Sequence, residues 1–408
     1  MKKLLALLLA LSCLFLTACN NNPADSTTGT GTGNPGNPTQ PNELELKDTI
    51  VSNITRDFID LPSRVIFEMS VAYGKIYNLY YSKADGKVYA YCFDPLCEHD
   101  NGYCLAAPQS EETLGFNFED LFFINNRFYY HTGSGQIISF AFDGTDKKIE
   151  YDAEYDLSAI SGNPWGKCTA IGPYIYIELR SYASEDGKAH TLRFNVETGE
   201  MVDLTEKTGN YIYPVYFYNG MLYGYKSGVG YLKSDLDLNY CEEIEQLHAT
   251  NFSSGSRFFK IVRDQDGTVK INAYNMQTEA LETYEIPGLE KSSKIIYVDD
   301  EYIYFYQRES IYLGDRWFKD ELTPYEKTNN GSIYRVNHDG TGLICIYEED
   351  EFEITGQEAV ITGDKILIEG HNIRIRDNQI ETWDSGVLVG TIGADGKIDS
   401  LDPVEVVE

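Results

Sequence analysis

Three cysteines and one histidine lie within fourteen residues, in the segment YCFDPLCEHDNGYC at 91–104. Cys92, Cys97, His99 and Cys104 supply three thiols and one imidazole, a ligand set that can bind Zn²⁺ tetrahedrally. Four protein ligands would leave no open coordination position, so such a zinc ion would be structural. Outside the cytoplasm the same thiols could instead oxidise to a disulfide.

The spacing of this cluster leaves both interpretations open. Asp94-Pro95 favours a turn that brings Cys92 and Cys97 together. The paired Cys-x2-Cys spacing of most zinc sites is missing. We favour a disulfide within the cluster slightly over structural zinc, and free thiols are the third alternative.

A second candidate site is the segment 308–331, a long insertion between two expected strands. Long loops in compact domains often carry function. Arg316, Trp317, Phe318 and Tyr325 of this loop could stack on a sugar or hold a peptide. The alternative is that Trp317 packs on the body of the domain.

Motifs of catalysis are missing. The sequence has no Gly-x-Ser-x-Gly, His-Glu-x-x-His, P-loop or Cys-x-x-Cys motif, and its six histidines are scattered along the chain. The acidic run at 348–353 lacks the spacing of an EF-hand calcium loop, and we expect it to be solvated. These observations favour a non-enzymatic role.

The chain begins with MKKLLALLLALSCLFLTAC, in which two lysines precede an apolar run of about 13 residues, too short to span a bilayer. The last four residues, Leu-Thr-Ala-Cys, resemble the lipobox of bacterial lipoproteins. The resemblance implies a signal peptide at 1–18 and a mature N-terminal Cys19 that carries diacylglycerol and acyl chains such as palmitate. Several acyl chains would attach the protein stably to the outer face of the cell membrane.

Residues 19–43 are rich in Asn, Thr, Gly and Pro, which cannot form a core, so we expect a disordered tether with a reach of about 25–30 Å. The remaining residues, 44–408, form the expected folded domain. The formal net charge of the chain is −31, which excludes nucleic acid as a plausible partner.

Asp-Gly dipeptides recur in this domain, at 85–86, 143–144, 186–187, 266–267, 339–340 and 395–396. Between apolar alternations they indicate hairpin turns, because glycine adopts positive φ at little cost. Short aromatic strands precede most of them. In one, Tyr302, Tyr304 and Tyr306 share one face, and Ile303 and Phe305 share the other. Two apolar faces predict strands packed between neighbouring sheets.

Repeating units of strands and turns begin near Val71, Leu121, Thr169, Val215, Arg257, Ile296 and Glu358. Their spacing, about 40–60 residues, is close to that of four-stranded propeller blades. We therefore predict an all-β fold, a β-propeller of seven four-stranded blades. Six or eight blades are the alternative counts, and a β-sandwich pair or a β-solenoid is the alternative architecture.

These repeats resemble propellers of the YWTD and TolB-like type, although the YWTD tetrapeptide itself is missing. More narrowly, Cys92, Asp94, Pro95, Leu96, Cys97 and His99 resemble a segment shared by a family of bacterial lipoproteins with a propeller domain. The resemblance covers the signal, the tether and nearly all of the domain, and it implies no particular activity.

We expect a lipid-anchored, extracytoplasmic binding module for a glycan, a peptide or an envelope protein. One alternative is a hydrolase or lyase that acts on an extracellular polymer at a central-channel site. Another is a scaffold for envelope assembly, by analogy with TolB-like propellers.

Overall fold

The structure, a computed structural model, describes residues 58–71, 75–92, 121–132, 135–142, 144–152, 165–180, 184, 187–247, 252–307, 331–348, 353–376, 379–404 and 406–407. All of them lie within the compact unit Glu45–Glu408. In these ranges, no helix has both the length and the apolar character needed to cross a bilayer.

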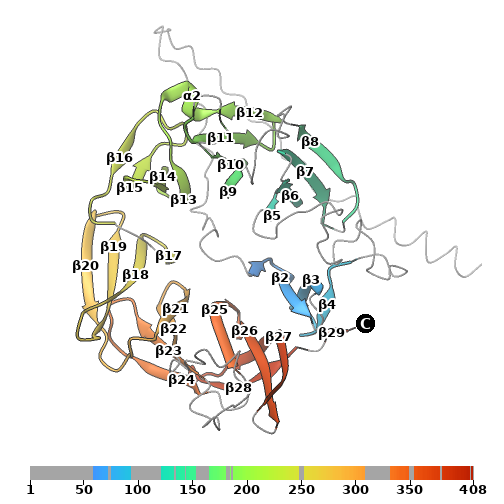
Figure 1. Ribbon diagram of the computed structural model, residues 1–408, viewed down its shortest axis with the longest axis vertical. Coiled ribbons are helices and arrows are strands. Elements are labelled where there is room, and N and C mark those ends of the chain that lie inside the picture. Colours follow the sequence, from blue (N-terminus) through green and yellow to red (C-terminus); the bar gives the residue numbers. More distant parts are fainter. Residues whose placement is uncertain are drawn as a thin grey trace, which may run out of the picture. The chain divides into compact units, whose positions relative to one another are not determined.

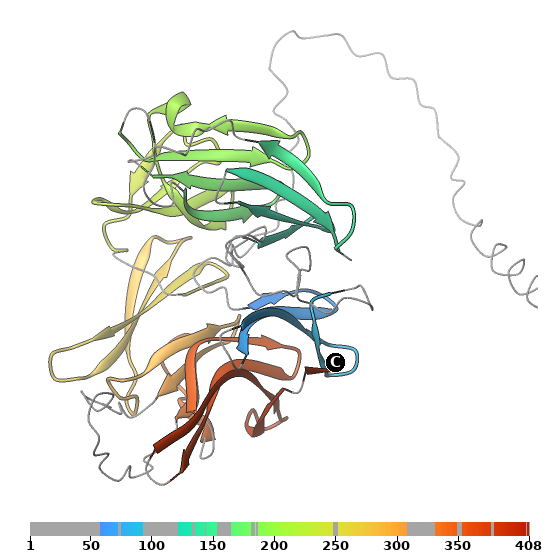
Figure 2. The same cartoon turned by 45° about the vertical axis from the view of Figure 1, so that its right-hand side comes forward.

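Seven sheets, each with four antiparallel strands, form a ring in chain order (Figure 1), which confirms the predicted seven-bladed β-propeller. The turned view in Figure 2 shows the twist that neighbouring strands accumulate within a blade. Blade 1 contains β1 (Phe58–Asp60), β2 (Arg64–Val71), β3 (Lys75–Ser82) and β4 (Val88–Ala90). Blade 2 contains β5 (Leu121–Ile124), β6 (Arg127–His131), β7 (Gln136–Ala141) and β8 (Lys148–Asp152). Blade 3 contains β9 (Trp165–Ile171), β10 (Tyr174–Leu179), β11 (His190–Asn195) and β12 (Glu200–Asp203).

The short helix α2 (Leu204–Thr208) joins blades 3 and 4. Blade 4 contains β13 (Tyr213–Tyr218), β14 (Met221–Lys226), β15 (Gly230–Ser234) and β16 (Cys241–Glu243), and blade 5 contains β17 (Phe252–Ser254), β18 (Arg257–Arg263), β19 (Val269–Asn275) and β20 (Ala280–Glu285). Blade 6 contains β21 (Lys294–Val298), β22 (Tyr302–Gln307), β23 (Ser332–Asn337) and β24 (Ile344–Glu348). Blade 7 contains β25 (Glu353–Thr362), β26 (Lys365–Arg376), β27 (Gln379–Ile392) and β28 (Ile398–Pro403).

The antiparallel order within each blade defines two faces of the ring. First strands of neighbouring blades contact one another, as β9 does with β13 and β21 with β25, so the first strand of a blade is its inner strand. Face 1 carries the turns that join first to second and third to fourth strands. Face 2 carries the turns between second and third strands and the connections between blades.

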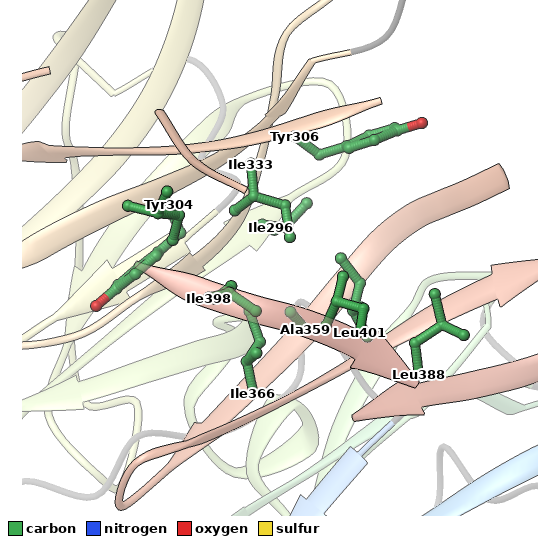
Figure 3. Close-up of a cluster of buried hydrophobic side chains, with 11 residues drawn as sticks. Ile296, Tyr304, Tyr306, Ile333, Ala359, Ile366, Leu388, Ile398 and Leu401 are labelled. Atoms are coloured by element: carbon green, nitrogen blue, oxygen red, sulfur yellow. The ribbon is translucent and has the colours of Figure 1, made fainter. Parts of the chain in front are cut away.

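Buried side chains form seven apolar clusters among the described residues, one at each interface between adjacent blades. The middle strands serve two clusters each, because successive side chains point to opposite faces. In β22, Ile303 and Phe305 face blade 5, whereas Tyr304 and Tyr306 face blade 7. Figure 3 shows the cluster between blades 6 and 7, which includes Ile366 of β26. The predicted two-sided burial is therefore confirmed.

The ends of the described chain meet in blade 1. The last strand, β29 (Val406–Val407), pairs in parallel with β4. The cluster between blades 1 and 7 contains Val88 of β4 and Val404, which lies just before β29. Blade 1 thus holds both the first and the last strand, and apolar packing between blades 7 and 1 completes the ring.

The predicted start of the first unit, near Val71, was wrong by one strand pair, because blade 1 begins at Phe58. The predicted start near Arg257 was wrong by one strand, because blade 5 begins at Phe252. The aromatic strand of blade 1 is its third strand, β3, whereas blades 2 to 6 carry aromatic residues on the second strand. The Asp-Gly turns also occupy two positions within a blade. All six of their glycines nevertheless adopt positive φ, between 71° and 93°, as expected for hairpins.

Folding stability should depend on pH through His131, which is 5% exposed at the end of β6. Burial lowers its pKa from 6.5 to about 4. As the pH falls, His131 becomes protonated near pH 6.5 in the unfolded chain, but only near pH 4 in the folded chain. Stability present above pH 6.5 should therefore decrease by about 3 kcal/mol as the pH falls through this window.

Urea unfolding of the wild type and of a His131→Gln variant, measured at pH 7 and pH 4.5, tests this contribution. We expect the difference in unfolding free energy between the two pH values to be smaller in the variant. If the unfolding free energy changed by the same amount between the two pH values in both proteins, the predicted contribution of His131 would be contradicted. The carboxylates contribute equally to the pH dependence of the wild type and of the variant, so they cannot produce a difference between them.

Candidate functional site

The residues singled out in the sequence lie almost entirely outside the described residues. This holds for Cys19, for Cys97, His99 and Cys104, and for the loop candidates Arg316, Trp317, Phe318 and Tyr325. Cys92 is described. It lies just after β4, is half-buried, and its amide donates to the Ala90 carbonyl at 2.8 Å. The disulfide, the zinc site and the binding loop therefore stay predictions.

The other described cysteines are packed against blades. Cys168 is fully buried in the cluster between blades 2 and 3. Cys241 and Cys345 are half-buried, and burial raises the pKa of both thiols. Within the described ranges, no three or more His, Cys, Asp or Glu side chains form a group suited to a metal ion.

A charged cleft of about 500 Å³ opens on face 2 between blades 3 and 4. Ligand-binding clefts commonly have volumes of 300–1,000 Å³. Its lining comes from β10 and the residue after it, the two residues before β11, the α2 connection, and the end of β14 with the residue after it. The lining residues are Glu178, Arg180, Lys188, Ala189, Thr205, Gly209, Tyr211, Lys226 and Ser227.

A β-bulge places Glu178 in this cleft. Ile177 pairs with Cys168 and Leu179 pairs with Trp165, so Glu178 alone lies opposite two residues of β9. Bulges of this kind redirect a side chain and are common beside functional sites. The carboxylate lies over Gly166, where a Cβ would come within 1.8 Å of Glu178 Oε2. A side chain at position 166 would therefore displace the acid.

Tyr211 fixes the other side of this carboxylate. Its hydroxyl donates a hydrogen bond to Glu178 Oε1. Burial, followed by this hydrogen bond and the negative charge of Glu178, raises the pKa of Tyr211. The phenol therefore keeps its proton at neutral pH, and the pair is a fixed donor and acceptor.

Helix α2 supports the floor of the cleft. Asp203 caps it by accepting the amide of Glu206 at 2.8 Å, which satisfies a backbone donor at the helix start. Thr205 is buried, and its hydroxyl accepts the Thr191 amide of β11 at 2.9 Å. These bonds connect the blade 3 sheet to the connection that carries Tyr211.

Three cations line the same cleft as this acid. Arg180 and Lys188 are exposed at the rim, and Lys226 is half-buried at the end of β14. In a chain with a net charge of −31, the described lining of this cleft contains three cations and one acid. Partial burial strengthens such electrostatic interactions relative to open water. The cleft is therefore suited to an anionic group.

Two further clefts on face 1 have different electrostatics. One, of about 460 Å³ between blades 6 and 7, is lined by Asp299, Asp300, Glu301 and Asp364. The other, of about 300 Å³, contains Lys233, which pairs with carboxylates at 2.5 Å and 3.2 Å. Among the described linings of these three clefts, that of the face 2 cleft alone combines three cationic side chains with a carboxylate that accepts a tyrosine hydroxyl.

Sequence reasoning missed this cleft. Its residues come from positions 166–227 and share no motif spacing. The available signals were Arg180, Lys188 and Lys226 at the ends of the β10–β11 and β14–β15 turns, and acidic residues at 185 and 186 obscure the first of them. They do not indicate that two turns from different blades adjoin.

No protein-family model matches the chain, and no curated protein matches it. Among solved structures, an oligogalacturonate lyase in complex with manganese is 9% identical, with coverage of 82% of this chain and 87% of that one and a TM-score of 0.48. BamB from Moraxella catarrhalis is 12% identical, with coverage of 76% and 79% and a TM-score of 0.34. The tricorn protease is 11% identical, with a TM-score of 0.28. The match covers 84% of this chain but only 30% of the tricorn protease. At such identities the likeness is one of fold alone.

Proposed function

We propose that this protein is a lipid-anchored binding module on the extracytoplasmic face of the membrane, whose propeller binds an anionic group of a glycan, a peptide or an envelope protein. The observation that supports this proposal best is the cleft on face 2, whose lining contains Arg180, Lys188 and Lys226 together with the hydrogen-bonded Glu178–Tyr211 pair. The lipid anchor and the tether rest on the sequence around Cys19.

The architecture suits binding by a preformed site. Apolar clusters hold blade 3 on blade 2 and on blade 4, so the strands beneath the cleft are packed on both sides. A rigid site loses less conformational entropy when a ligand binds than a flexible one does. The strands that carry Glu178 and Lys226 therefore have defined positions before the ligand arrives.

Replacing Lys226 with methionine should weaken anion binding about tenfold or more, because a charge-assisted hydrogen bond contributes about 1.5–3 kcal/mol. The full chain in detergent would be applied to an array that contains acidic and neutral glycans and acidic and neutral peptides. We expect binding to acidic members only, with affinity decreasing as salt rises from 50 to 500 mM.

Lys365→Met is the matched control, because Lys365 lies on face 1 beside Asp364, at 3.4 Å. It should leave binding unchanged. Equal binding of neutral and acidic members, or equal loss in the two variants, would contradict the proposed site.

A further inference from the structure

We infer that the ligand of the face 2 cleft is a hydroxylated carboxylate of the sugar-acid class, and that Glu178 selects it. This inference rests on the proposed function, because it names the ligand of the same cleft. The observation behind it is that the protein holds an acid in the middle of an anion site. For a ligand that presented only negative charge, that acid would be a disadvantage.

The carboxylate of Glu178 is held on two sides. A Cβ on residue 166 would lie 2.7 Å from Glu178 Cβ, so the acid fills the space that glycine leaves on β9. On the opposite side, Tyr211 donates to Oε1. A carboxylate has about four acceptor positions, and this hydrogen bond uses one of them. The remaining acceptor positions suit hydrogen-bond donors on a ligand.

The ligand must therefore combine two features within one cleft. A carboxylate would pair with Arg180, Lys188 or Lys226, and a neighbouring hydroxyl would donate to Glu178. Arginine binds a carboxylate through two parallel hydrogen bonds. Sugar acids carry a carboxylate and several hydroxyl groups on one ring, which matches this arrangement.

Phosphate fits less well. At neutral pH a phosphate group carries about −1.5 to −2 charges and presents mainly acceptor oxygens. It would be attracted by the cations, yet repelled by the fixed carboxylate of Glu178. Glu178 therefore discriminates against phosphate and favours ligands that have donors beside their anionic group.

An acidic peptide also combines carboxylates with donors, but the lining of the cleft disfavours it. Peptides are recognised through apolar pockets, through a free strand edge or, for acidic motifs, through clusters of arginines. The described lining of this cleft contains one arginine, Arg180. Apart from Ala189, Gly209 and the ring of Tyr211, the lining side chains are charged or hydroxylated. Charged and hydroxylated side chains of this kind can form hydrogen bonds with the ring hydroxyls of a sugar acid, which a polyglutamate lacks.

Calorimetry on the full chain in detergent tests the inference with four probes: tetraglucuronate, its methyl ester, inorganic phosphate and pentaglutamate. We expect tetraglucuronate to bind most tightly. Its uncharged ester should bind at least about tenfold more weakly than tetraglucuronate does. Glu178→Gln fills the same space above Gly166, and we expect it to weaken tetraglucuronate about tenfold and to strengthen phosphate.

Glu282→Gln is the matched control, because Glu282 also accepts a tyrosine hydroxyl, that of Tyr284 at 2.6 Å, on the outer strand β20 of blade 5. It should change neither affinity. If phosphate or pentaglutamate binds as tightly as tetraglucuronate, or if Glu178→Gln leaves their ratio unchanged, the sugar-acid inference is overturned although the anion site stands. If no anionic probe binds, and Lys226→Met changes nothing on the array, the proposed function fails as well.

Discussion

Replacing Cys19 with alanine should abolish lipid attachment of this protein. The physical reason is that the anchor depends on one sulfur atom, which carries the diacylglyceryl group in the lipobox resemblance. Each buried CH2 of an acyl chain contributes about 0.8 kcal/mol, and two or more chains make attachment stable. Cells expressing the full chain and fed with labelled palmitate should yield a labelled protein for the wild type and an unlabelled one for Cys19→Ala.

Cys13→Ala is the matched control, because Cys13 lies inside the apolar run that precedes the lipobox. This variant should incorporate label as the wild type does. Label incorporation is the decisive measurement, since an uncleaved signal could itself keep some protein with the membrane fraction. A Cys19→Ala protein that still carries labelled lipid would contradict the predicted anchor.

Replacing Phe258 with alanine should lower the free energy of unfolding by about 3–5 kcal/mol. Phe258 is fully buried at the interface between blades 4 and 5. Its ring centroid lies 5.4 Å from Tyr216, 5.6 Å from Tyr223 and 6.5 Å from Tyr231. Three aromatic partners would lose contact together, and pairs of this kind contribute beyond the area that they bury.

Leu281→Ala is the matched control, because Leu281 is 38% exposed on the outer strand β20 of the same blade. We expect it to change the unfolding free energy by less than about 1 kcal/mol. Urea unfolding followed by tyrosine fluorescence would measure both variants. Similar losses in the two would mean that the interface between blades 4 and 5 is not where the stability resides.

The seven blades could be predicted from the sequence because the signals of a propeller are local. Strand alternation and Asp-Gly turns are decided within about ten residues, and both recur at blade spacing. The two apolar faces of 302–306 already implied a sheet on either side, as the structure confirms for Ile303 and Tyr304. Blade 1 was misplaced because its first strand has three residues, too few to show a period.

The closure of the ring could not be predicted in the same way. β29 has two residues and pairs with β4, more than three hundred positions earlier in the chain. A two-residue strand has no detectable alternation, and its pairing depends on where the last blade ends. Only packing of the seven blades decides that partner.

By itself, the sequence determined the all-β fold class and favoured seven blades over six or eight, and it predicts attachment through Cys19, because each depends on short-range patterns of residue type. The tertiary structure alone decided that Glu178, Tyr211 and Lys226 line one cleft. The bulge opposite Glu178 and the glycine beneath it depend on the register of two strands, and the cations come from turns of different blades. Electrostatic and hydrogen-bonding chemistry of this kind depends on distance in space, which sequence spacing does not specify.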